Sequence, residues 1–117
     1  MHFYVPVMKN IILCSSNPIL LKSLYAILRD EGYNVDTVDR PALAVQKVMF
    51  GLLYDFVIVD SEPFGLSAED AVRIIKTVAP DMPIVHVGTV SHEVPSMAVE
   101  TPIDLEEFKR TIHSIAV

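Results

Sequence analysis

Short apolar runs separated by helical patterns constrain the fold of this chain more than any other feature. Four such runs are Ile11–Cys14, Val35–Val38, Phe56–Val59 and Ile84–Val87, and all but the weaker second run lack an alternating polar face. Continuous apolar runs of this length are typical of parallel strands that are covered on both sides. The pattern therefore predicts a parallel sheet with helices on both faces.

The predicted helices between these runs have recognisable starts and stops. Asn17–Pro18 has the form of an N-cap followed by proline at the first helical position, and Gly32 ends that helix. Residues 42–50 are predicted to form a second helix that ends near Gly51. Ser67 and Asp104 are each followed three residues later by an acidic residue, as in a capping box, and predict two further helix starts.

The connection after the fourth strand is unusually short. Residues 88–96 separate that strand from a fifth, predicted at Met97–Glu100, and glycine and proline interrupt them. Parallel strands normally need a crossover of about a dozen residues or more, usually a helix. We predict that no regular helix of two turns forms here. One edge of the sheet then either exposes an apolar interaction segment or is covered by the loop and the last helix. The residues of this candidate interaction segment are Val90, His92, Val94 and Met97.

Size and apolar content predict one domain. The chain has 117 residues, 51% of them hydrophobic, which we assign to a single domain over 1–117, with a core at about 10–117 and an N-terminal extension at 1–9. The longest apolar stretch, Val48–Val59, is interrupted by a glycine and an aspartate and is too short to cross a bilayer. The N-terminus lacks the features of a secretion signal. We therefore expect no membrane insertion.

Charge and cysteine content narrow the possible partners and location. A formal net charge of −6, without a basic stripe, argues against nucleic-acid binding. Cys14 is the single cysteine and is predicted to be buried in its strand, so no internal disulfide forms. These features predict a cytoplasmic protein.

Four segments carry a resemblance to a known family. They are IILCSSNP (11–18), YDFVIVD (54–60), MPIVHVGT (82–89) and TPIDLEEF (101–108). In order and spacing they resemble the receiver domains of response regulators over residues 10–117. The resemblance implies a flavodoxin-like three-layer α/β/α sandwich with a five-stranded parallel sheet of order 2-1-3-4-5. In this chain the helix between the fourth and fifth strands would be missing or reduced to a turn.

The resemblance places Asp60 at the phosphoacceptor position. Receivers carry an adjacent acidic pair that holds Mg²⁺ beside this aspartate, and those positions are occupied here by Ser15 and Ser16. Serine hydroxyls bind Mg²⁺ weakly without carboxylate support. A weak cation site formed by Asp60 with Glu62 is the alternative, but hard cations need more oxygen ligands than these two provide.

Three further positions depart from the receiver pattern. Gly88 replaces the hydroxyl residue that contacts the phosphoryl group, Thr101 replaces the lysine that pairs with it, and Ala98 replaces the aromatic switch residue. Each of the lost groups would stabilise charge or relay the signal. The resemblance therefore implies a degenerate receiver, or pseudo-receiver, in which Asp60 is a vestigial phosphoacceptor.

Three functional hypotheses follow. The first is a receiver-like signalling module of two-component, or phosphorelay, type that is not an enzyme and is not phosphorylated. It would need no cofactor, Mg²⁺ included, and would act by contacts with a protein partner in a bacterial signalling pathway or by self-association. The second is a receiver that is phosphorylated on Asp60. The third is a small-molecule-binding flavodoxin-like domain, because fold does not fix function.

The histidines offer no stronger alternative. His86 lies within the fourth strand, where a neutral packed side chain is the expected role. His92 and His113 fall on a predicted loop and a predicted helix, without metal-ligand spacing. Catalysis or metal binding by these residues is therefore not expected.

Overall fold

The computed structural model describes residues 9–50, 53–60, 67–88, 97–99 and 103–116. Within them, parallel strands form one sheet of order β2-β1-β3-β4-β5. The strands are β1 (Asn10–Cys14), β2 (Asn34–Val38), β3 (Phe56–Asp60), β4 (Ile84–Val87) and β5 (Met97–Val99). The parallel sheet and its strand order agree with the prediction.

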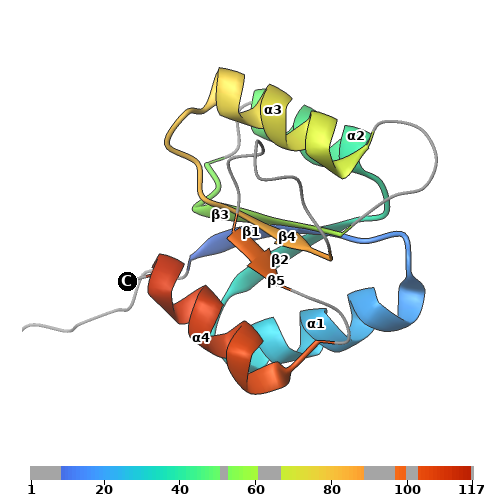
Figure 1. Cartoon of the computed structure of the whole chain (residues 1–117), viewed down its shortest axis with the longest axis vertical. Helices are drawn as coiled ribbons and strands as arrows, with labels where there is room; N and C mark the ends of the chain where they lie inside the picture. Colours follow the sequence, from blue (N-terminus) through green and yellow to red (C-terminus); the bar gives the residue numbers. More distant parts are fainter. Residues whose placement is uncertain (1–8, 51–52, 61–66, 89–96, 100–102, 117) are drawn as a thin grey trace, which may run out of the picture.

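Four helices in the described part of the chain complete a three-layer arrangement. They are α1 (Pro18–Asp30), α2 (Pro41–Met49), α3 (Ala68–Val78) and α4 (Leu105–Ala116). Helices α1 and α4 cover one face of the sheet, and α2 and α3 cover the other (Figure 1). None of the described helices has the length and apolarity needed to cross a bilayer.

The predicted loss of a helix between β4 and β5 concerns residues that lie outside the described ranges. Val90, His92 and Val94 of the candidate interaction segment fall there as well. Met97 is described: it begins β5 and its side chain is 45% exposed. The proposed use of this segment as an interaction surface stays a prediction.

Side-chain caps fix where three helices begin, as the sequence predicted. The Asn17 side chain accepts hydrogen bonds from the N–H groups of Ile19 and Leu20 at 3.0 and 3.2 Å. Ser67 Oγ accepts from the Asp70 N–H, and Asp104 Oδ1 accepts from the two N–H groups that follow Leu105. Each cap satisfies donors that the first turn of a helix leaves without intrahelical partners. Helix α1 therefore starts directly beyond the carboxyl end of β1.

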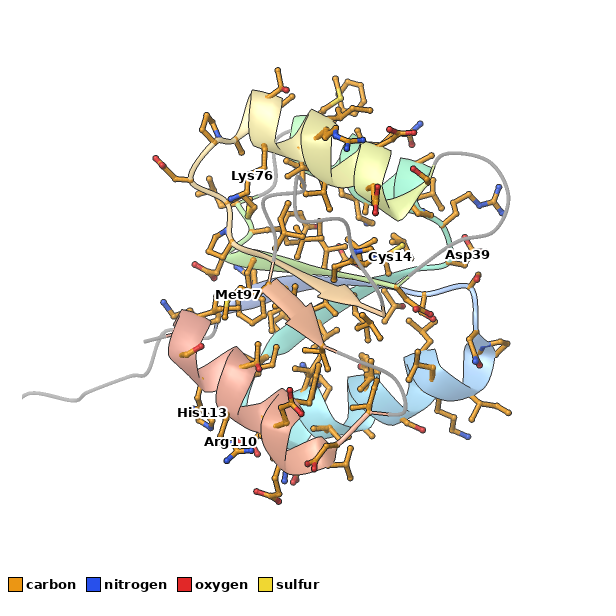
Figure 2. The ribbon with its side chains drawn as sticks, viewed as in Figure 1. Cys14, Asp39, Lys76, Met97, Arg110 and His113 are labelled. Atoms are coloured by element: carbon orange, nitrogen blue, oxygen red, sulfur yellow. The ribbon has the colours of Figure 1, made fainter. Side chains whose placement is uncertain are left out.

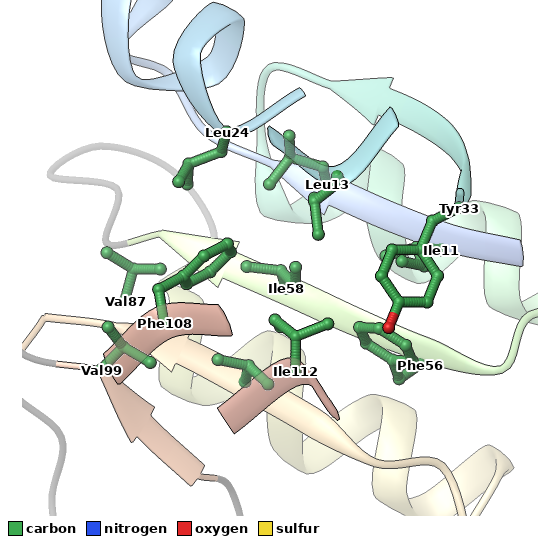
Figure 3. Packing of buried hydrophobic residues seen from close by; sticks show 12 residues of the cluster. Ile11, Leu13, Leu24, Tyr33, Phe56, Ile58, Val87, Val99, Phe108 and Ile112 are labelled. Atoms are coloured by element: carbon green, nitrogen blue, oxygen red, sulfur yellow. The ribbon is translucent and has the colours of Figure 1, made fainter. Parts of the chain in front are cut away.

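The two faces of the sheet bury different side chains. Toward α2 and α3 the core consists mostly of alanine, valine and isoleucine. Toward α1 and α4 it contains aromatic rings, including Tyr33 and Phe56, whose centroids lie 5.9 Å apart in an edge-to-face arrangement. Figure 3 shows Phe108 of α4 packed among the side chains of β3, β4 and β5. In the described part of the chain helices thus pack on both faces of the sheet, and in such folds the functional site lies at the carboxyl ends of the strands.

Candidate functional site

The β1–β3 register brings two of the predicted site residues together. Cys14 is paired with Val59, so the next residues, Ser15 and Asp60, lie side by side at the carboxyl end of the sheet. Ser15 is 1% exposed and its Oγ donates a hydrogen bond to Asp60 Oδ2 at 2.9 Å. Asp60 is half-buried. A neutral hydroxyl thus contacts the carboxylate from the side where the receiver pattern places an acidic residue.

Ser15 is held in place by neighbours on both sides. Its N–H donates to the Val38 carbonyl at 3.1 Å, and its Oγ accepts a hydrogen bond from the Asn17 N–H at 3.1 Å. The same Oγ lies 3.5 Å from the Asn17 carbonyl, a longer contact to a neutral acceptor. A hydroxyl has one proton to donate, and a bond to a carboxylate is the stronger of the two. The Ser15 proton is therefore directed to Asp60.

Figure 2 shows where this end of the sheet lies in the molecule. Cys14, the residue before Ser15, and Asp39, the residue after β2, are close together at the end of the sheet from which α1 departs. Met97, at the start of β5, lies toward the other end. Asp39 forms an exposed ion pair with Arg40 at 3.1 Å. The carboxylate of Asp39, which lies at the edge of the site, is therefore paired with the guanidinium group of Arg40.

Gly88 has a backbone conformation that favours glycine, as well as lacking the side chain of the receiver pattern. It follows β4 with a φ of 110°, a conformation that residues with a Cβ rarely adopt, and its N–H donates to the Val99 carbonyl at 2.7 Å. A serine or threonine placed here would strain this conformation. The sequence showed only the missing hydroxyl; the glycine-requiring backbone was missed, because a single glycine after a strand carries no signal of its φ.

Of the other predicted site residues, some lie in the described part of the chain and some lie outside it. Ser16 is exposed and follows Ser15 at the start of the turn into α1. Ala98 lies in β5, in register with His86, and nothing further is described of its side chain. Thr101 and Glu62 lie outside the described residues. The structure therefore brings Ser15 and Asp60 together and does not test the proposed Asp60–Glu62 pair.

The described residues of this site do not fit a Mg²⁺ ion. In the described part of the chain no group of three or more histidine, cysteine, aspartate or glutamate side chains is placed to hold a metal. Mg²⁺ is bound in proteins mainly through carboxylates and phosphates. Next to Asp60 the structure offers a serine whose hydroxyl proton already points at that carboxylate.

His86 is a buried, neutral side chain, as the sequence predicted. It is 1% exposed in the middle of the sheet, in register with Val59 on β3. Burial lowers its pKa, and the negative charges of Glu69 and Asp60 oppose that shift without cancelling it. By contrast, His113 is exposed on α4, with its Nε2 3.4 Å from a carboxylate oxygen of Glu31.

Two open grooves lie on either side of the edge strand β2, away from Asp60. The groove of about 360 Å³ is lined by Val38, Leu43, Gln46, Lys47 and Phe50. The groove of about 390 Å³ is lined by Pro18, Leu21, Lys22, Tyr25, Val35, Asp36 and Thr37. Neither is lined by Ser15 or Asp60. They therefore give no support to a small-molecule site at the end of β3.

A cluster of three polar side chains links β2, α2 and the segment before β3, beside the first of these grooves. Asp36 Oδ2 accepts hydrogen bonds from Lys47 Nζ at 3.0 Å and from the Tyr54 hydroxyl at 2.5 Å. The Tyr54 hydrogen bond, and to a lesser extent Lys47, lower the pKa of Asp36 against an opposing effect of burial. Burial and the Asp36 carboxylate raise the pKa of Tyr54. All three groups are partnered, so the cluster is structural.

Solved structures of receiver domains superpose on nearly the whole chain. For a response regulator receiver protein from Sinorhizobium medicae, the identity is 23% and the TM-score 0.83, over 92% of this chain and 94% of that one. The response regulator TrrA of Thermotoga maritima, solved in complex with Mg²⁺-BeF, has 26% identity and a TM-score of 0.81, over 92% of this chain and 99% of TrrA.

A complex of the histidine kinase ThkA with TrrA gives a similar match. The identity is 26% and the TM-score 0.82, over 94% of this chain and 100% of the matched chain in the complex. No protein-family model matches the sequence, and no curated protein matches it.

Proposed function

We propose that this domain, which has the fold of response regulator receiver domains, is a receiver-like module of two-component signalling that works through protein–protein contacts without phosphorylation of Asp60. The observation that carries the proposal is the hydrogen bond from Ser15 Oγ to Asp60 Oδ2. It supports a site whose carboxylate is already satisfied by a neutral partner. The domain would be a cytoplasmic, non-catalytic component that needs no Mg²⁺ and binds no nucleic acid.

The electrostatics of phosphoryl transfer support this proposal. A dianionic phosphoryl group that approaches a carboxylate needs positive charge or hydrogen-bond donors around it. At this site the Ser15 hydroxyl supplies one neutral donor, and Gly88 supplies no side chain. Thr101 stands where the receiver pattern has a lysine. At the positions where the receiver pattern supplies stabilising charge and donors, an acyl phosphate on Asp60 would therefore meet Ser15, Gly88 and Thr101 instead.

Exposed apolar residues near the site support a role in protein binding. Ile19, in the first turn of α1, is 79% exposed, and Leu105, the first residue of α4, is 51% exposed. Helix α1 follows β1 and helix α4 follows β5, and both helices lie on the same face of the sheet. Both therefore begin at the carboxyl end of the sheet, where Asp60 lies. We propose that a histidine kinase or another protein of a bacterial signalling pathway contacts this end, as a kinase is found with TrrA.

The test is to add Mg²⁺ and beryllofluoride to the domain and to monitor its amide chemical shifts by NMR. We expect no saturable shifts at Ser15, Asp60 or Gly88 when both are added at millimolar concentration. The matched control is Asp60→Asn, which keeps an oxygen acceptor for Ser15 but cannot form the acyl phosphate analogue. Saturable shifts in the natural chain that vanish in Asp60→Asn would contradict the proposal.

Phosphorylation of Asp60 is the second candidate function. It is favoured by one observation, the place of this half-buried carboxylate at the end of β3 in a receiver fold. Incubation with a small phosphodonor and intact-mass measurement separates the candidates. Our proposal expects no added phosphoryl mass, whereas the second candidate expects one that is absent from Asp60→Asn.

A further inference from the structure

Strand β2 forms an open edge of the sheet. It comes first in the strand order and pairs with β1, and no other strand in the described part of the chain pairs with it. The Asn34 N–H donates to the Lys9 carbonyl at 2.9 Å, so Asn34 and every second residue after it face β1. The N–H and C=O groups of Val35 and Thr37 therefore face away from β1, where they can bond another extended chain.

The two grooves beside β2 lie on opposite faces of this edge. The groove of about 390 Å³, between β2 and α1, includes Val35 and Thr37 and is called the α1-side groove. The groove of about 360 Å³, between β2 and α2, includes Val38 and is called the α2-side groove. Successive side chains of a strand point to opposite faces of a sheet. A segment that adds to β2 would therefore place its side chains in the two grooves in turn, as in recognition by strand addition.

The two grooves favour different side chains. In the α2-side groove Leu43 and Phe50 form an apolar wall, and Phe50 is 79% exposed. Lys47 in this groove is already paired with Asp36 at 3.0 Å. In the α1-side groove Lys22 is exposed, and none of the ion pairs among the described residues includes it. The α2-side groove therefore fits an apolar side chain, and the α1-side groove fits a carboxylate.

A second copy of the chain is a poor occupant of this edge. In an antiparallel contact between two β2 strands, the register that uses both Val35 and Thr37 sets the two Asp36 side chains opposite each other on one face. The Tyr54 hydrogen bond, and to a lesser extent Lys47, lower the pKa of Asp36 against the effect of burial, so it is ionised at neutral pH. Like charges directly opposite each other destabilise a strand pair. Asp36 therefore opposes self-association at β2, as charged residues in edge strands commonly do.

We propose that β2 binds an extended segment of a partner protein by strand addition, with apolar side chains in the α2-side groove and carboxylates beside Lys22. The main-chain groups of Val35 and Thr37 bond the segment, and the grooves select its alternating pattern. This surface does not include Ser15 or Asp60. The proposal therefore holds or fails independently of phosphorylation at Asp60.

A capped peptide in which leucine alternates with glutamate is the probe, added to the whole chain at physiological ionic strength so that distant charges are screened. We expect saturable amide shifts and slower hydrogen exchange at Val35 and Thr37. Lys22→Glu should weaken binding about threefold, the contribution of an exposed ion pair, and should strengthen binding of an alternating leucine–lysine peptide. Arg110→Glu, the same charge change at an exposed residue of α4, should alter neither affinity. The absence of saturable shifts at β2, or equal effects of the two substitutions, would overturn the proposal.

Removal of one edge donor provides the second readout. Thr37 is exposed and its N–H faces away from β1, so Thr37→Pro removes that donor without removing a bond to β1. We expect this variant to lose the peptide-induced shift at Val35, whereas Thr37→Ala, which keeps the N–H, should retain it. Peptide binding by Thr37→Pro as strong as by Thr37→Ala would contradict strand addition. Concentration-dependent shifts at Val35 and Thr37 without peptide would assign the edge to a second copy and would also overturn the proposal.

Discussion

Ser15 and His86 are the polar side chains that the described part of the chain buries almost completely, and they behave in opposite ways. Each is 1% exposed. Ser15 follows β1 on the face of Leu13, toward α1 and α4, and is bonded to a carboxylate and to a backbone N–H. His86 lies within β4 on the face of Ile84, toward α2 and α3, and burial keeps it neutral.

The difference shows how position along a strand decides what a buried polar group does. At the end of a strand, Ser15 meets Asp60 and the start of α1, which supply hydrogen-bond partners that fix its hydroxyl. Within a strand, His86 is buried, which makes its charged form costly, and the charges of Glu69 and Asp60 offset only part of that cost. The first residue therefore shapes the candidate site, and the second is expected to make the stability of the fold depend on pH.

The largest effect is expected from Ser15→Asp, which turns the polar pair into a repulsive one. Two carboxylates at hydrogen-bond distance cannot both ionise without cost, and a displacement of two pKa units corresponds to about 3 kcal/mol. We expect the free energy of unfolding to fall by about this amount at neutral pH. Urea unfolding with and without Mg²⁺ is the measurement.

Millimolar Mg²⁺ should restore a large part of the loss in Ser15→Asp and leave the natural chain unchanged. Mg²⁺ binds a pair of carboxylates and neutralises their charge. Ser16→Asp is the control, because Ser16 is exposed and does not contact Asp60 in the described hydrogen bonds. Equal stabilisation of the natural chain and Ser15→Asp by Mg²⁺ would show that the serine is not what weakens metal binding.

The layers of the fold were predictable from sequence because they depend on local patterns. Continuous apolar runs gave the strands, and the caps at Asn17, Ser67 and Asp104 gave the helix starts within a residue. The apolar run Phe56–Val59 became β3, whose last residue is Asp60, paired with Val87 of β4.

The site was predictable only as a set of positions. Alignment with the receiver pattern placed Ser15 beside Asp60, but a hydrogen bond depends on the β1–β3 register and on the direction of one hydroxyl proton. The positive φ of Gly88 was likewise beyond sequence reasoning. Backbone conformation is a property of the assembled fold.

An effect of intermediate size is expected from His86: the free energy of unfolding should fall in mild acid. Its folded-state pKa is lowered by burial, below the unfolded value of about 6.5, while Glu69 and Asp60 reduce that shift. Between the two pKa values the unfolded chain binds more protons than the folded chain. Stability is therefore fully present above about pH 6.5 and falls as the pH drops, by at most about 1.4 kcal/mol per pH unit.

Unfolding in urea at a series of pH values from neutral to mildly acidic measures this loss. His86→Met, which keeps a large apolar side chain in the same place, should remove the contribution and flatten the dependence. His113→Gln serves as the control, because His113 is exposed. A natural chain whose stability is as flat in this range as that of His86→Met would show that folding does not shift the pKa of this histidine.

The smallest effect is expected from removal of the Ser15 hydroxyl alone. In Ser15→Ala the half-buried Asp60 loses the hydrogen bond from Ser15 Oγ at 2.9 Å, so we expect a loss of about 1 kcal/mol in the free energy of unfolding. Asp60→Asn keeps an oxygen that accepts the same hydrogen bond and should cost less. In a double-mutant cycle with Ser15→Ala and Asp60→Ala, the coupling free energy should be about 1 kcal/mol. Strictly additive effects would mean that the Ser15 and Asp60 side chains do not interact in solution. The contrast between a hydrogen-bonded Ser15 and a buried His86 would then no longer hold.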